Sequence, residues 1–173
     1  MKNKKIRKTV AKTSAHQRPP WDQYFLGIME MVGSRATCDR GRSGCVIVKE
    51  KQILTTGYVG SPIGAEHCDD VGHEMHEVIN DDGIVSKHCI RTVHAEQNAI
   101  AQAARLGVAL TGSTMYCRMT PCYVCAKIII NAGIKRVVSL NDYHAGKKSK
   151  DIFKKCGVEF SLVNTEIEKY KNQ

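Results

Sequence analysis

The sequence predicts an α/β fold in which a sheet of about five strands is covered by helices. Three observations support this fold class. Strand-like and helix-like segments alternate along the second half of the chain, which is typical of a helix-covered sheet. The length of 173 residues, 42% of them hydrophobic, suits one domain with one sizeable core. No internal repeat and no second domain boundary interrupts the chain, so we expect a single folded unit.

The chain begins with a basic segment, residues 1–18, that contains seven Lys or Arg residues and no acidic residue. We expect this segment to be a disordered tail. Two prolines end it, and apolar residues then recur at helical spacing, which predicts a helix over about 20–37. Two short apolar runs, 45–48 and 53–56, flank a polar turn and predict a β-hairpin.

Residues 61–91 break this pattern. They contain few large apolar side chains but many histidines, cysteines and acidic residues. The sequence predicts a long loop over this segment, and loops of this length usually have a function. We expect His67 and His76 in this segment, like His144 further along, to lie at the surface.

The second half of the chain predicts alternating strands and helices. Each predicted helix ends before a glycine, which is a common helix stop. The predicted strands span residues 115–117, 136–140 and 158–163, and the predicted helices span residues 95–106, 123–132 and 149–156. Cys117 and Cys156 fall on faces of these elements that we expect to be buried, and we expect the same of Cys45 in the first hairpin.

The positive charge of the chain is concentrated in its tail. Lys and Arg outnumber Asp and Glu by 26 to 17, a net charge of +9, and the seven basic residues of the tail supply most of it. The remaining chain is nearly balanced in charge and gives no sign of gripping a polynucleotide. The tail is therefore the place where we expect any contact with nucleic acid.

The cysteines indicate a reducing environment. Eight cysteines are too few for a disulfide scaffold in a chain of this length, and no apolar stretch approaches the ~18 residues of a membrane span. No apolar segment typical of a signal peptide follows the basic start. We therefore expect a cytoplasmic protein without membrane association, in which cysteines favour metal binding or catalysis.

Metal-ligand residues begin two of the predicted helices. His94 and Glu96 open one helix, and Cys122 and Cys125 open the next. Helix N-termini lower thiol pKa values, and one imidazole with two thiolates leaves a tetrahedral zinc one open position for water. The pKa of that water falls toward ~7, and Glu96 can carry its proton to a substrate.

The two motifs together are more informative than either alone. A single histidine at a helix start is usually a cap residue, and a single Cys-x-x-Cys pair also occurs in redox sites and in structural zinc sites. His-x-Glu followed by Pro-Cys-x-x-Cys is the signature of zinc deaminases, and this chain has both parts in that order. The combination favours catalysis.

Beyond these motifs, the sequence resembles the deoxycytidylate (dCMP) deaminases over residues 18–163. The likeness lies in WDQYF at 21–25, GCVIV at 44–48, HAEQNAI at 94–100, TPCYVCAK at 120–127 and IKRVV at 134–138. It implies a three-layer cytidine deaminase-like fold with a mixed sheet. It also implies a deaminase domain over 19–165 and a C-terminal tail over 166–173. One departure is Val59, where family members commonly have Asn.

The resemblance implies zinc-dependent hydrolysis of dCMP to dUMP and ammonia, a reaction at the C–N bond of a cyclic amidine that supplies dUMP for dTMP synthesis. In that mechanism zinc hydroxide attacks C4 of the pyrimidine. Glu96 protonates N3 and then the leaving amine. The zinc ligands implied by the resemblance are His94, Cys122 and Cys125.

A second, structural zinc is carried by several bacterial and phage members of this family. The resemblance places its ligands at Cys38, Cys68, His73 and either His88 or Cys89. A closed Cys/His site explains how a loop poor in apolar residues is ordered, because metal ligation replaces missing burial. The alternative is a flexible lid with solvated histidines.

A nucleotide substrate and nucleotide effectors need further residues. Arg40 and Arg42 are candidate phosphate donors, and Tyr143 is a candidate to close over the pyrimidine face. Family members are often homo-oligomers, commonly hexamers, regulated by dCTP and dTTP. Arg105 matches a position tied to the effector response.

Two other functions compete with dCMP deamination. One is deamination of a base in single-stranded nucleic acid or tRNA, reached through the basic tail, or of another cytosine nucleotide. The other is a zinc-stabilised nucleic-acid-binding module without catalysis. Glu96 speaks against this last function, because a structural zinc site does not use a proton carrier.

Overall fold

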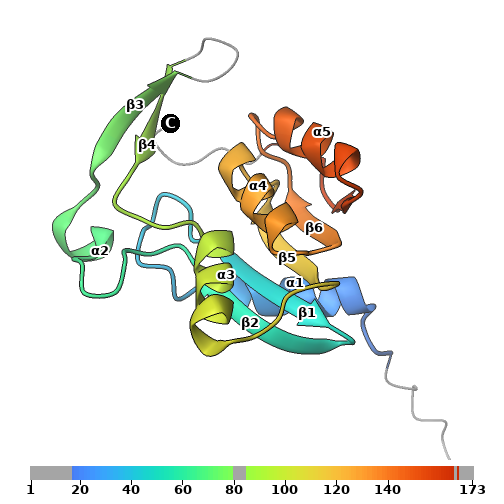
Figure 1. The fold of residues 1–173 in the computed structure, drawn as a ribbon. Coiled ribbons are helices and arrows are strands. Elements are labelled where there is room, and N and C mark those ends of the chain that lie inside the picture. The colour runs from blue at the N-terminus through green and yellow to red at the C-terminus, as the bar shows by residue number, and fades with distance from the viewer. Residues whose placement is uncertain (1–16, 80–84, 166, 168–173) are drawn as a thin grey trace, which may run out of the picture.

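A computed structural model describes residues 17–79, 85–165 and 167, and its centre is a mixed five-stranded sheet (Figure 1). In spatial order the strands are β2 (Gln52–Tyr58), β1 (Gly44–Lys49), β5 (Thr114–Met119), β6 (Arg136–Asn141) and β7 (Glu159–Leu162). Strand β1 runs antiparallel to β2 and β5, whereas β5, β6 and β7 are parallel. The predicted sheet of about five strands is confirmed.

Helices cover both faces of this sheet and give three layers. Helix α1 (Trp21–Gly33) packs on one face, and α3 (Ala95–Leu106), α4 (Tyr123–Asn131) and α5 (Lys147–Lys155) contribute to the core on the other. Successive strand residues point to opposite faces. Val46 accordingly packs with the α1 core and Ile47 with the other.

The cysteines predicted to be buried do not all lie in the core. Cys45 and Cys117 are fully buried, as expected. Cys156 is exposed, so its predicted burial is wrong. Helix α5 ends at Lys155, and Cys156 lies in the turn that leads to Gly157. The helical periodicity that predicted a buried Cys156 therefore no longer applies at this residue, because the helix ends one residue before it.

The first helix is shorter than predicted. The sequence predicts a helix to about residue 37, but α1 ends at Gly33. The Thr37 N–H donates to Val59 O at 3.1 Å, so the chain after α1 turns toward the end of β2. This tertiary hydrogen bond takes a backbone donor that a longer helix would have used internally.

The segment predicted as a long loop contains regular structure, so this prediction is wrong in part. It includes a short helix, α2 (Cys68–Val71), and an antiparallel hairpin of β3 (Met75–Ile79) and β4 (Val85–Cys89). The hairpin extends away from the sheet (Figure 1). Every residue of β3 is exposed. A strand without a buried face does not need alternating apolar and polar residues, which is the pattern that identifies a strand in a sequence.

Parts of the predicted tails lie outside the described residues. The predicted basic tail overlaps residues 1–16, and the predicted C-terminal tail includes 166 and 168–173, none of which the structure describes. Within the described ranges, no helix combines the length and apolar character that a membrane span requires.

A polar clamp joins α1 to the sheet. Arg136 donates two hydrogen bonds of 2.8 Å to the two carboxylate oxygens of Asp22. The Tyr116 hydroxyl donates to Asp22 at 2.8 Å as well. The hydrogen bonds from Arg136 lower the pKa of Asp22, although partial burial opposes them. The clamp fixes the start of α1 against β5 and β6.

We predict that Asp22→Asn lowers the free energy of unfolding by about 1 kcal/mol at neutral pH, because the half-exposed pair is partly screened by solvent. Since the folded-state pKa is lowered, this stabilisation is complete above the usual Asp pKa and is lost as pH falls through the lowered value. Urea unfolding at a series of pH values measures it. Asp151→Asn, which breaks the exposed pair with Lys147, is the control and should have little effect. An equal loss in both variants would contradict the prediction.

Candidate active site and second Cys/His cluster

Two helix starts bring a histidine and two cysteines together. His94 is the N-cap residue of α3, and its N–H donates to Gln97 Oε1 at 3.2 Å. Cys122 is the N-cap residue of α4, and Cys125 lies in the first turn of that helix. His94 Nδ1 lies 3.6 Å from Cys122 Sγ and 3.4 Å from Cys125 Sγ. The structure thus brings together the three residues predicted to hold the catalytic metal.

These three donors fit a tetrahedral zinc ion. Zinc binds Cys sulfur at ~2.3 Å and His nitrogen at ~2.0 Å, so two ligands of one tetrahedron lie roughly 3.5–3.8 Å apart. The separations of 3.4 and 3.6 Å match this. Within the described residues, no fourth His, Cys, Asp or Glu joins this group. A metal held there would therefore keep an open position, as catalytic zinc sites do.

The pKa values of Cys122 and His94 are shifted toward their charged forms. Hydrogen bonding to the Cys125 thiol, followed by the contact with His94, lowers the pKa of the Cys122 thiol to about 4. Cys122 in turn raises the pKa of His94 to about 9. A lowered pKa favours the thiolate, the form of cysteine that binds metal.

Glu96 lies beside these ligands without being one of them. It is buried, and its Oε2 lies 3.9 Å from Cys125 Sγ. Burial raises the pKa of its carboxyl group. Together with His94 and Cys122 it lines a cavity of about 320 Å³. A carboxyl group that holds a proton more readily, next to an open metal position, is suited to proton transfer.

Close packing of α3 on the edge strand fixes this geometry. A Cβ atom on Gly57 of β2 would lie 2.3 Å from Ala95 O and 2.4 Å from Ala99 N. Only glycine allows the first turn of α3 to approach the strand so closely. Asn98 Nδ2 adds a hydrogen bond of 2.8 Å to Tyr58 O. The position of His94, the candidate metal ligand before α3, thus depends on a glycine in β2.

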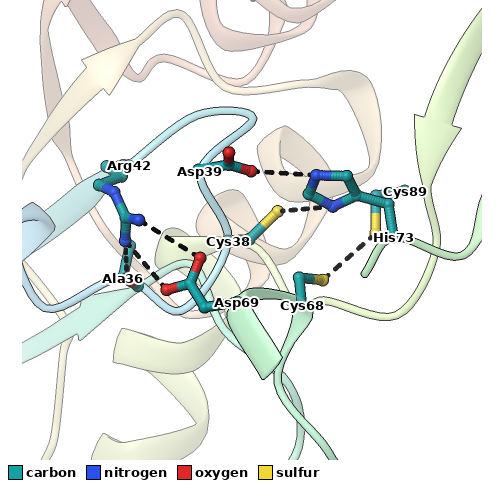
Figure 2. A network of polar contacts seen from close by, with 8 residues as sticks. All are labelled: Ala36, Cys38, Asp39, Arg42, Cys68, Asp69, His73 and Cys89. Atoms are coloured by element: carbon teal, nitrogen blue, oxygen red, sulfur yellow. Dashed lines mark hydrogen bonds and ion pairs between the residues drawn. The ribbon is translucent and has the colours of Figure 1, made fainter. Parts of the chain in front are cut away.

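A second cluster gathers three cysteines and a histidine (Figure 2). Cys38 Sγ lies 3.7 Å from His73 Nδ1, and Cys68 Sγ lies 3.6 Å from Cys89 Sγ. The donor atoms of all four lie within 4.8 Å of one another. Asp39 Oδ1 contacts His73 Nε2 at 3.0 Å, the carboxylate–histidine arrangement that orients metal ligands. Four Cys/His donors complete a tetrahedron, which is typical of a structural zinc site.

The structure brings Cys89 into this cluster and leaves His88 outside it. The two residues are neighbours at the end of β4, and neighbouring strand residues point to opposite faces. His88 lines the cavity that contains Glu96, as Cys38 and Cys89 of the cluster also do, and its Nε2 lies 2.8 Å from Ser86 Oγ. The sequence alone left both residues as candidates.

The candidate substrate residues separate into two groups. Arg40 and Tyr143 line the cavity. Arg42 is held elsewhere, because its guanidinium contacts both carboxylate oxygens of Asp69 at 3.2 and 3.3 Å and also donates to Ala36 O. Arg105, the candidate effector residue, lines a different cavity.

Asp142 supports the site and was missed by the sequence analysis. It accepts hydrogen bonds from Thr120 Oγ1 at 2.7 Å, the Tyr143 N–H at 2.8 Å and Lys150 Nζ at 2.6 Å. It therefore connects the residue before Pro121, the loop that carries Tyr143, and helix α5. Its place two residues after the strand predicted over 136–140 was the available signal, since loops that follow strands often hold functional residues.

Comparison with known proteins identifies the family. Residues 19–141 match the family described as the cytidine and deoxycytidylate deaminase zinc-binding region. The chain belongs to this deaminase family. ComE operon protein 2 of Bacillus subtilis (strain 168) is 37% identical over 147 residues, which cover 85% of this chain and 73% of that protein.

Two dCMP deaminases from phages are also similar to this chain. Deoxycytidylate deaminase of Mycobacterium phage D29 is 38% identical over 124 residues, covering 70% of this chain and 94% of that enzyme. The crystal structure of dCMP deaminase from cyanophage S-TIM5 in complex with dCMP and dUMP matches with a TM-score of 0.68 and 28% identity. That match covers 85% of this chain and 99% of the phage chain, so the deaminase fold extends through most of the molecule.

We predict that Gly57→Ala displaces α3 and lowers the free energy of unfolding by roughly 1–3 kcal/mol. Because His94 and Glu96 move with the helix, deaminase turnover should fall about 100-fold. Gly27→Ala in α1 is the control, since a Cβ there meets nothing within 4 Å and should add about 0.5–1 kcal/mol of stability. Thermal unfolding and turnover assays measure both variants. Native activity in Gly57→Ala would contradict the packing argument.

Proposed function

We propose that this chain catalyses the hydrolytic deamination of dCMP to dUMP and ammonia. The observation that carries this proposal is the group of His94, Cys122 and Cys125 beside the buried carboxyl group of Glu96. His94, Cys122 and Glu96 line one cavity. Three metal donors and one proton carrier are the set that zinc deaminases use. The likeness to dCMP deaminases of two phages supports dCMP as the substrate.

The residues of the cavity have distinct roles in this proposal. His94, Cys122 and Cys125 hold zinc, which when bound activates a water molecule at its open position. Glu96 would take one proton from that water and deliver it to N3 of the pyrimidine. It would then carry the remaining proton, from the hydroxyl group now on C4, to the amine, which leaves as ammonia while the C4 carbonyl forms. Burial raises the pKa of Glu96, so the carboxyl group accepts and retains a proton more readily than an exposed one.

Substrate positioning is assigned to residues on the cavity wall. Of the two arginines that the sequence suggested, Arg40 lines the cavity, and we assign to it the phosphate contact. Tyr143 lines the same cavity and is held by the hydrogen bond from its N–H to Asp142. We assign to its ring the closure over the pyrimidine face.

The second cluster is proposed to hold a structural zinc, with Cys38, Cys68, His73 and Cys89 as ligands. A two-stranded hairpin without a buried face is marginally stable by itself. His73 precedes β3, and Cys89 ends β4. A metal bound by these residues fixes the base of the hairpin to the rest of the chain.

Several finer expectations from the family resemblance are kept as proposals. The deaminase domain is placed at 19–165, which is supported by the family match over 19–141. Regulation by dCTP or dTTP is placed at the cavity that Arg105 lines together with Tyr58 and Asn98. Assembly into a homo-oligomer such as a hexamer and a cytoplasmic location complete the proposal.

The decisive test compares substrates on the zinc-loaded protein. We predict release of ammonia from dCMP and little from single-stranded oligonucleotides. Glu96→Gln should lower dCMP turnover at least 100-fold and retain its zinc, because the change removes the proton carrier and no ligand. Ammonia release and metal analysis check both statements. Deamination confined to the oligonucleotide would replace the proposed function by nucleic-acid base deamination, and an active Glu96→Gln variant would exclude the proposed mechanism.

Metal content tests the second cluster. We predict about two zinc ions per chain in the wild type and about one in Cys89→Ser, with faster proteolysis of the hairpin in the variant. Cys156→Ser is the matched control, because Cys156 is exposed and belongs to neither cluster. Elemental analysis and limited proteolysis measure the two effects. A wild type with only about one zinc per chain would exclude the structural site.

A further inference from the structure

We propose that Cys89 and Cys68 form a redox-active pair that reacts with hydroperoxides to give a reversible disulfide. The reaction gives the second Cys/His cluster a chemistry beyond metal binding. The formation of the disulfide rests on the positions of the two thiols. Its consequences, release of zinc and loss of turnover, rest on the structural zinc site and the dCMP deaminase function proposed above.

Cys89 is the cysteine of the second cluster that an oxidant reaches most easily. Its side chain is partly exposed, and it lines the cavity that contains Glu96. Cys38 lines the same cavity but is only 2% exposed, and Cys68 is 4% exposed and does not line it. Because the oxidation of a cysteine depends on its accessibility, a small hydroperoxide in the cavity reacts first with Cys89.

Cys68 is placed to react next with the oxidised Cys89. The two Sγ atoms lie 3.6 Å apart, whereas Cys38 Sγ lies beside His73 Nδ1 at 3.7 Å (Figure 2). A disulfide bond is ~2.05 Å long, so the two sulfur atoms have to approach each other by about 1.6 Å. A movement of this size is within the range of side-chain rotation and small shifts of the backbone.

The elements that carry the pair can accommodate this movement. Cys68 begins the four-residue helix α2, Cys89 ends the hairpin strand β4, and neither cysteine belongs to the apolar core. The catalytic candidates Cys122 and Cys125 also lie close together, but Cys125 is part of the main core and Cys122 packs against it. Close packing resists displacement there. The disulfide therefore forms more readily between Cys68 and Cys89.

The reaction is a two-electron oxidation of two thiols by one hydroperoxide. The Cys89 thiolate attacks one peroxide oxygen, an S–O bond forms, and the O–O bond breaks with loss of hydroxide or alkoxide. Cys68 sulfur then attacks the Cys89 sulfenic acid, so that the S–S bond forms and the S–O bond breaks with loss of hydroxide. Protons from the thiols or from solvent convert the leaving groups of hydrogen peroxide to two water molecules. A dithiol reverses the reaction by exchange.

The disulfide removes two of the four donors from the cluster. Cys38 and His73 alone do not complete a tetrahedral site, so zinc bound there is released. Cys38 lies in the loop after α1 and His73 precedes β3, so the release also removes a connection between that loop and the hairpin. Cys38 and Val78 of β3 both line the active-site cavity. Oxidation of the cluster therefore disturbs one wall of this cavity and lowers turnover.

Peptide mapping of the zinc-loaded protein after treatment with hydrogen peroxide tests the proposal. Lys87 is the only trypsin site between Cys68 and Cys89, so the disulfide joins the peptides 52–87 and 88–91. We expect this linked product, release of about one of the two zinc ions to a chromogenic indicator, and a fall in dCMP turnover of about 10-fold. Dithiothreitol with added zinc should restore the separate peptides, the zinc content and the turnover.

Two variants accompany the wild type. Cys68→Ser should stop at the Cys89 sulfenic acid, which dimedone traps, because the second thiol is missing. Cys156→Ser is the matched control, since Cys156 is exposed and lies outside both clusters, and it should respond like the wild type.

Three results would contradict the redox pair. They are wild-type peptides 52–87 and 88–91 that stay separate after treatment, a disulfide found only between Cys122 and Cys125, and the absence of trapped sulfenic acid at Cys89 in Cys68→Ser. A wild type that does not deaminate dCMP before treatment would overturn the proposed function instead. Peptide mapping would still decide whether the disulfide forms.

Discussion

The contact of His94 Nδ1 with the sulfur atoms of Cys122 and Cys125 is the interaction on which the rest of the site depends. It joins the starts of two helices that lie 28 residues apart in the chain. The sheet makes this possible, because α4 follows the carboxyl end of β5 while α3 lies on β2 at Gly57. Free backbone N–H groups at both helix starts favour the thiolate that the site requires.

One side of the cavity is formed by helices of the main core, and the other side is formed by the exposed hairpin of β3 and β4. The helices α3 and α4 belong to the main core, whereas the hairpin of β3 and β4 buries almost nothing of its own. Its position depends on the Cys/His cluster at its base and on the hydrogen bond from Arg40 to Lys87 O. Polar contacts and the Cys/His cluster therefore shape the half of the site that apolar packing does not reach.

Sequence patterns predicted helices and strands correctly where buried residues recur with a regular period. The helix predicted over 95–106 has the same bounds as α3. Its small buried residues identify the face that packs on the core, and Gly107 identifies where the helix ends. The hairpin was missed because an element with both faces near solvent leaves no apolar alternation. The roles of Arg42 and Asp142 depend on partners distant in sequence, Asp69 and Thr120, which no local pattern reveals. Which of His88 and Cys89 joins the Cys/His cluster likewise depends on where the side chains of β4 point in the folded chain.

The clamp at Asp22 determines where the N-terminal end of the fold lies. Arg136 starts β6, and Lys51, which lies over the Trp21 ring, sits in the turn between β1 and β2. The cavity is at the other end of the strands, where Thr120 and Tyr143 follow β5 and β6. A surface or fusion partner attached ahead of Trp21 would thus hold the protein by the end opposite its cavity and leave the entrance open to small molecules.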